Sequence, residues 1–173
     1  MDKNKVLDKI RDSLAEHNAN CRLYEEGEIS PGRVLVCEHR ALGVYGQDGT
    51  GQYMFADLEM GAEGVDYFVC LISYAEDLFG QDMPELRKAI CLLNYYMPYG
   101  AFCLGSENDL SFKYTLMLPD DMDQKTADEL AEMAVVHAMD GYRKNIAMLL
   151  SVAQGKLSAD DIIDMFDVGD EEA

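Results

Sequence analysis

The sequence predicts an α+β protein in which helices pack against one side of an antiparallel sheet. Leu110, Phe112, Tyr114, Leu116 and Leu118 alternate with more polar positions, which is typical of a strand with one buried face. A short apolar segment at 101–104 precedes this strand, and the turn-forming residues between the two indicate a hairpin. Hairpin connections and a half-polar strand favour an antiparallel sheet with segregated helices.

The first half of the chain predicts one helix followed by three or four strands. A helix over residues 2–18 is indicated by Val6, Leu7, Ile10 and Leu14, which recur at helical spacing. A turn-rich stretch with Gly27 and Pro31 separates this helix from the strands. The strands are expected at residues 33–38, 41–46, 51–60 and 65–74. The last of them is almost continuously apolar, which implies a central strand buried on both faces.

The second half of the chain begins with another helix and the hairpin. Asp82, Pro84 and Glu85 form a capping pattern that predicts the helix start, and Pro98 is expected to end it. The hairpin strands at 101–104 and 110–118 follow.

Two further helices complete the predicted fold. Pro119 ends the hairpin, and Asp121 or Asp123 caps a third helix that continues to about Gly155. Ser158 and Asp161 cap a last short helix. With no internal repeat or second boundary, we expect a single α+β domain over residues 1–168 and an acidic flexible tail over residues 169–173.

The charge balance excludes several classes of partner. Lys and Arg number 14 against 33 Asp and Glu, which gives a formal net charge of −19. Such a surface repels phosphate backbones and anionic lipids, so we expect no nucleic-acid partner and no membrane partner. The sequence also shows neither a secretory leader nor an apolar run of membrane-spanning length.

The five cysteines are odd in number and lie in apolar stretches, which is typical of reduced thiols in a protein core. We therefore expect all five to be free and the protein to be cytoplasmic. Cys70 and Cys91 are the strongest candidates for the core.

Motifs for metal or phosphate binding are incomplete. Cys37 with His39, or His137 with Asp140, supplies only half of a zinc site. Asp121, Asp123 and Glu132 fit positions of a calcium loop, but Lys125 and Thr126 occupy places that need a ligand and a glycine, so helix capping explains them better. The glycines at 46–51 precede a strand, which indicates a hairpin turn instead of a phosphate loop.

The sequence also contains no nucleophile elbow, and its three histidines are scattered. We therefore expect no metal, no cofactor and no catalytic residues, and the protein is predicted not to be an enzyme.

The third predicted helix has an unusually wide apolar arc. One stripe suits packing on the sheet: Ala131, Val135, Met139, Tyr142, Ile146, Leu149 and Leu150. A second stripe lies beside it, and we call it the second stripe: Leu130, Ala134, His137, Ala138, Gly141, Met148 and Val152. Its small residues allow close helix approach. Either another helix of the same chain covers it, or it is an interface with a second subunit or client.

Tyr95, Tyr96, Met97 and Tyr99 form an aromatic cluster where the second helix meets the hairpin. Tyr and Met are enriched at recognition surfaces, although they also fill cores. Tyr95, Tyr96 and Tyr99 therefore join the second stripe as candidate interface residues.

The order of these elements resembles that of the bacterial YbjN-like proteins, a family of proposed sensory-transduction regulators. The residues that carry the resemblance are Leu93-Asn94, Pro98-Tyr99-Gly100-Ala101-Phe102, the strand from Leu110 to Leu118, and Leu118-Pro119. The resemblance spans about residues 1–155 and implies the fold of type III secretion chaperones, which are small, acidic, often dimeric proteins that bind clients without ATP. It implies no catalytic residues. The helix after Ser158 and the long 23–33 loop depart from the family pattern.

These observations favour a non-enzymatic protein-interaction module, chaperone-like or regulatory, that binds a protein partner or client and forms a homodimer. A first alternative is an acidic inhibitor, such as an immunity protein, that masks a basic partner. A second alternative is an enzyme whose site is assembled from residues far apart in the sequence.

Overall fold

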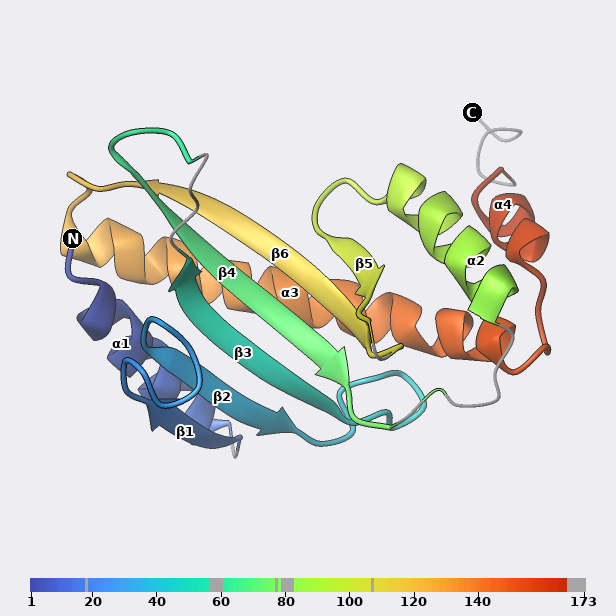
Figure 1. The fold of residues 1–173 in the computed structure, drawn as a ribbon, viewed down its shortest axis with the longest axis horizontal. Helices are drawn as coiled ribbons and strands as arrows, with labels where there is room; N and C mark the ends of the chain where they lie inside the picture. Colours follow the sequence, from blue (N-terminus) through green and yellow to red (C-terminus); the bar gives the residue numbers. More distant parts are fainter. Residues whose placement is uncertain (18, 57–60, 77, 79–82, 107, 168–173) are drawn as a thin grey trace.

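In the computed structural model of the chain, residues 1–17, 19–56, 61–76, 78, 83–106 and 108–167 are described. Their strands form one antiparallel sheet in the order β1-β2-β3-β4-β6-β5 (Figure 1). The strands are β1 (Asn20–Tyr24), β2 (Val34–His39), β3 (Gly49–Ala56), β4 (Val65–Tyr74), β5 (Ala101–Leu104) and β6 (Leu110–Pro119). The α+β class and the antiparallel sheet predicted from the sequence are confirmed.

The helices of the described residues are α1 (Lys3–Glu16), α2 (Met83–Tyr96), α3 (Gln124–Ala153) and α4 (Ala159–Asp167). Helices α1 and α3 cover one face of the sheet, while α2 and α4 pack together beside the end of α3 (Figure 1). The Asp2 carboxylate accepts the Asn4 N–H at 3.1 Å, and the Asp123 carboxylate accepts the Thr126 N–H at 3.0 Å. Capping therefore explains both helix starts, as predicted for Asp123.

The core lies between this helical layer and the sheet. From α1 it takes the four residues predicted from helical spacing, and from α3 it takes Tyr142 and Ile146. Strand β4 is central, as predicted, and its Phe68 and Ile72 are fully buried beneath the helices. Its opposite face is only partly buried, because no helix of the described residues lies over that side of the sheet. The prediction of burial on both faces is therefore wrong for much of this strand.

Two strand predictions in the first half need correction. Strand β1 pairs with β2 although the sequence there reads as a turn-rich stretch. The strand predicted at 41–46 is instead a turn, in which the Gly43 N–H donates to the Gln47 carbonyl at 2.9 Å. Ala41 and Gly46 have φ values of 50° and 81°, which a strand does not contain. The predicted strand residues 57–60, the Asp82 cap and the 169–173 tail lie outside the described residues.

Strands β5 and β6 form the predicted hairpin, but they differ in length. All of β5 pairs with the first four residues of β6, from Leu110 to Lys113. On its other side β6 pairs with β4 along nearly its whole length. The stretch 114–119 of β6 therefore has a strand on one side only among the described residues, and we call this stretch the open edge.

Candidate interaction surface

Three ring side chains from different elements meet beside the open edge. Tyr99 follows α2, Tyr114 lies on β6 and His137 lies on α3. The ring centroids are 5.9 Å apart for Tyr99 and Tyr114, 5.3 Å for Tyr99 and His137, and 6.1 Å for Tyr114 and His137. All three are half-buried. We call this group the aromatic triad; Tyr99 and His137 were candidates from the sequence.

The backbone of the open edge has a defined direction. The Asn94 side-chain amide bonds both the N–H and the C=O of Phe102, at 2.8 and 2.9 Å, so these groups point away from β6. Phe102 and its partner Phe112 are therefore a non-hydrogen-bonded pair. Because the direction alternates along a strand, Thr115 and Met117 present their N–H and C=O groups to the open side.

The open edge carries no charged side chain from Tyr114 to Pro119. Met117 is 65% exposed on it. Natural proteins usually protect such edges with charges, bulges or covering segments, because an unpaired strand is a template for another chain. Thr115 and Met117 were not singled out from the sequence. The signal was available, since the hairpin strands predicted at 101–104 and 110–118 differ in length.

The second stripe of α3 is mostly covered within the chain. Ala134, Ala138, Gly141 and Val152 are buried, whereas Leu130, His137 and Met148 are half-buried. A Cβ on Gly141 would come within 2.5 Å of the Phe112 ring on β6. The small residues thus let α3 approach its own sheet and helices. The four buried residues are therefore covered within the chain, while the half-buried Leu130, His137 and Met148 stay interface candidates.

Tyr95 and Tyr96 belong to a different surface. Tyr96 stacks on Phe166 of α4, with ring centroids 4.9 Å apart, and Tyr95 packs edge-on against Tyr96 at 5.3 Å. Tyr95 is 83% exposed. The predicted cluster is therefore split: Tyr99 joins the aromatic triad, Tyr96 joins α2 to α4, and Tyr95 packs on Tyr96 at the surface.

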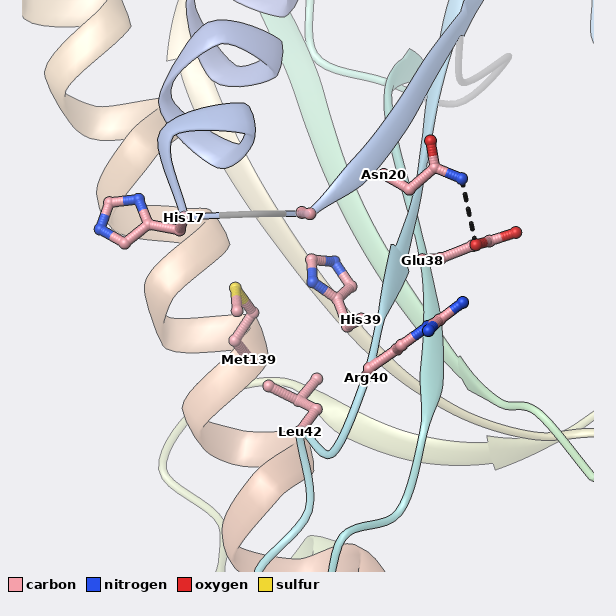
Figure 2. Close-up of a pocket in the computed structure, with 8 residues that line it drawn as sticks. His17, Asn20, Glu38, His39, Arg40, Leu42 and Met139 are labelled. Atoms are coloured by element: carbon pink, nitrogen blue, oxygen red, sulfur yellow. Dashed lines mark hydrogen bonds between the residues drawn. The ribbon is translucent and has the colours of Figure 1, made fainter.

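A cavity of about 480 Å³ lies between the end of α1, strands β1 and β2, and α3. Figure 2 shows His39 between β2 and α3, while Glu38 and Arg40 point away from the helix. The buried His39 Nε2 lies 2.8 Å from the Tyr53 hydroxyl. Burial lowers the pKa of His39 and raises the pKa of Tyr53 well above its usual range.

The chemistry of this cavity is limited by its lining. Its walls carry His17, Ala19, Asn20, Glu38, His39, Arg40, Leu42 and Met139, and no hydroxyl or thiol nucleophile is among them. The His39 ring instead forms a buried hydrogen bond with the Tyr53 hydroxyl. The residues that line this cavity therefore contain no nucleophile paired with a general base.

Two residues that the sequence offered as possible metal ligands, Cys37 and Asp140, have other partners in the structure. Cys37 is in a disulfide, and the Asp140 carboxylate pairs with Lys144 and Arg143, which together lower its pKa. Across the described part of the chain, no group of three or more His, Cys, Asp or Glu side chains is placed to hold a metal ion.

The prediction of five free thiols is wrong for two of them. Cys21 and Cys37 are directly opposite each other on β1 and β2 and form a disulfide, with their Cα atoms 4.1 Å apart. The sequence did not show this disulfide, because β1 was not predicted and the pairing of β1 with β2 is what brings the two cysteines together. Cys70 is buried as expected, whereas Cys91 is exposed and not in the core. The cysteines therefore no longer argue for a reducing compartment.

Comparison with protein-family models and with curated proteins found no match to this sequence. In the described residues, no helix is both long and apolar enough to cross a membrane.

Proposed function

We propose that this protein is a non-enzymatic protein-interaction module, chaperone-like or regulatory in role, that binds a protein partner along the open edge. The observation that carries the proposal is the uncharged, one-sided stretch of β6 beside the aromatic triad. Thr115 and Met117 direct backbone hydrogen-bonding groups outward along this stretch.

An extended partner segment would complete the ladder that β5 leaves unfinished. Main-chain hydrogen bonds to Thr115 and Met117 would supply affinity, and side chains of the partner would contact Tyr114 and His137 on the helix-covered side. Because the ring side chains of the aromatic triad are already half-buried, they have little rotamer freedom left to lose on binding, which favours this surface for recognition.

We also propose that the chain is a distant relative of the YbjN-like proteins. In support, its elements follow the predicted order of helix, strands, helix, hairpin and helix. Strand β1 in the 19–33 region and helix α4 are additions to that pattern.

The net charge of −19 favours a second candidate, an acidic inhibitor that masks a basic partner. Binding of that kind is strongly salt-dependent, because exposed charges farther apart than a Debye length are screened. Strand addition at an uncharged edge depends much less on salt. Raising the salt concentration to about 0.5 M therefore separates the two candidates.

Thr115→Pro tests the proposed function. The substitution removes an N–H that points away from β4, so it blocks the open edge and leaves the β4–β6 ladder in place. We expect it to abolish retention of the partner that the unmodified protein binds in a pull-down. Val136→Glu, at a 61% exposed position of α3, is the matched control and should retain that partner. Retention by both variants contradicts the proposal.

A further inference from the structure

The sheet has one face over which no helix of the described residues lies, and we call it the uncovered face. Figure 1 shows this face toward the reader, with α3 behind the strands. Side chains alternate along a strand, and Phe68 and Ile72 of β4 lie beneath the helices, so Val69 and Leu71 lie on the uncovered face. Strand pairing places Met54 of β3 beside Val69. These residues form the middle of the uncovered face.

The middle of the uncovered face is apolar and carries no charge. The residues that the two central strands place there are Thr50, Gln52, Met54 and Ala56 of β3, and Val65, Tyr67, Val69, Leu71 and Ser73 of β4. The charged strand residues of this face, Arg22, Glu38 and Lys113, lie on β1, β2 and β6. An antiparallel sheet face left in water is usually polar, so an uncharged apolar middle indicates a surface that another molecule covers.

Exposed carboxylates stand at both ends of the uncovered face. They are Glu26, Glu63 and Asp120 at the end where β4 begins, and Glu38, Glu76 and Asp109 at the end where β4 finishes. The face therefore presents an apolar middle between two negatively charged ends. An occupant that carries positive charge at its own ends would complement this pattern, whereas an acidic occupant would be repelled.

One of these carboxylates lies in a cavity of about 760 Å³ at the end where β4 begins. Glu26, Met54 and Tyr67 are among the residues that line it. Lys3 and Arg33 line it too, but they already pair with the carboxylates of Asp66 and Glu25. Glu26 makes no ion pair with any described residue, so this cavity has a carboxylate available for a basic side chain of an occupant.

The dimensions and the backbone of the face favour a helix as the occupant. The N–H and C=O groups of β3 and β4 lie in the plane of the sheet and are used in its ladder, so an occupant must satisfy its own backbone, as a helix does. The distance from β2 to β4 is about 10 Å, close to the helix diameter of about 10–12 Å. The ten residues of β4 extend over about 33 Å, which a helix of about 20 residues spans.

We propose that the uncovered face binds an amphipathic helix of a partner protein, with its apolar side on β3 and β4 and basic residues at both of its ends. The inference goes beyond the proposed function, because the open edge binds an extended segment through backbone groups and lies elsewhere on the sheet. A second copy of this sheet is a poor occupant, since its own carboxylates would face those of the first copy.

A synthetic peptide of 20 residues, with leucines on one helical side and lysines on the other, is the probe for this surface. With the methionine methyl groups labelled for NMR, we expect the Met54 resonance to shift on binding. The resonance of Met133, which is 47% exposed on α3, should stay in place. A peptide with glutamates instead of lysines should bind at least about tenfold more weakly. A scrambled peptide of the same leucine and lysine content, which forms no apolar side, should leave Met54 unshifted.

A pair of substitutions removes apolar area from the face without changing the net charge. The double variant Met54→Gln, Leu71→Gln should bind the leucine and lysine peptide about tenfold or more weakly, because the apolar contact is lost while long-range attraction is kept. Val136→Gln, at a 61% exposed position of α3, is the matched control and should bind the peptide as the unmodified protein does. Circular dichroism checks that both variants are folded.

Three results overturn the inference: a shift of Met133 without one of Met54, equal affinity for the scrambled peptide, or unchanged affinity in the double variant. The Thr115→Pro variant separates this outcome from the fate of the proposed function. If Thr115→Pro abolishes retention of the partner while the peptide does not bind at Met54, the inference fails and the proposed function stands. If Thr115→Pro retains the partner while the peptide does bind at Met54, the proposed function fails and the inference stands.

Discussion

Gly141 allows α3 to come close to β6. The Phe112 ring below it is fully buried, and a Cβ at this position would lie 2.5 Å from Cζ and 2.8 Å from Cε1 of that ring. A second buried contact joins His39 to Tyr53 under the edge of the sheet.

Gly141→Ala is therefore expected to destabilise the protein. Alanine gains about 1 kcal/mol in helix propensity, but overpacking against a fixed ring costs about 1–3 kcal/mol, so we expect a net loss. Urea unfolding measures it. Phe112→Leu removes the ring tip, and in that background Gly141→Ala should become neutral or stabilising. An equal loss in both backgrounds would show that the Phe112 contact is not the cause.

His39 should make the stability depend on pH. Burial lowers its pKa below the ordinary value of 6.5, so the unfolded chain takes up a proton at a higher pH than the folded chain does. The free energy of unfolding should therefore fall as pH drops below about 6.5, relative to a His39→Gln variant. The slope of this difference should not exceed about 1.4 kcal/mol per pH unit. Parallel pH profiles for the two proteins would contradict the prediction.

Single residues were the hardest features to predict from the sequence. Helical spacing placed Ala138 and Gly141 on one stripe, but spacing does not show whether the neighbour is the same chain or another. Tyr99 and His137 were candidates for the right surface, although Tyr114, which joins them, was read only as a strand residue. The Cys21–Cys37 pair depended on strand pairing, which cysteine spacing does not encode.

Among the elements, helices were predicted more accurately than strands. The four helices follow from apolar periodicity and from capping residues such as Asp123 and Ser158, which are local signals. Strand β1 has no such signal, because its half-exposed residues become a strand only by pairing with β2. The segment predicted as a strand at 41–46 forms a turn, because Ala41 and Gly46 both have positive φ values that a strand does not contain.

The disulfide fixes β1, a short strand at the edge of the sheet. Reduction should therefore loosen β1 first and lower the free energy of unfolding by about 3 kcal/mol, given that the bridged residues are 16 apart in sequence. Urea unfolding with and without a thiol reductant measures this. Cys91→Ser removes an exposed thiol and serves as the control, with no change expected. Alkylation of all five cysteines in protein kept free of reductant would contradict the prediction.

For the whole molecule, the sequence predicted the fold class and the order of elements, because alternation and capping agree with each other along most of the chain. It did not predict the open edge as a site. That feature arises only when β5 and β6 are aligned in one sheet and α3 packs on β6. The strongly negative charge excluded partners but did not by itself show where a partner binds.

The strand order divides the sheet into two parts that differ in how far apart in the sequence the paired strands are. Strands β1 to β4 follow one another as a meander, so each new pairing closes only a short loop. Strands β4 and β6 are neighbours in the sheet, but α2 and β5 lie between them in the sequence. Pairing β4 with β6 therefore closes a longer loop and costs more chain entropy. Because long-range closures slow folding, the β4–β6 seam is expected to be the last pairing to form and to set the folding rate.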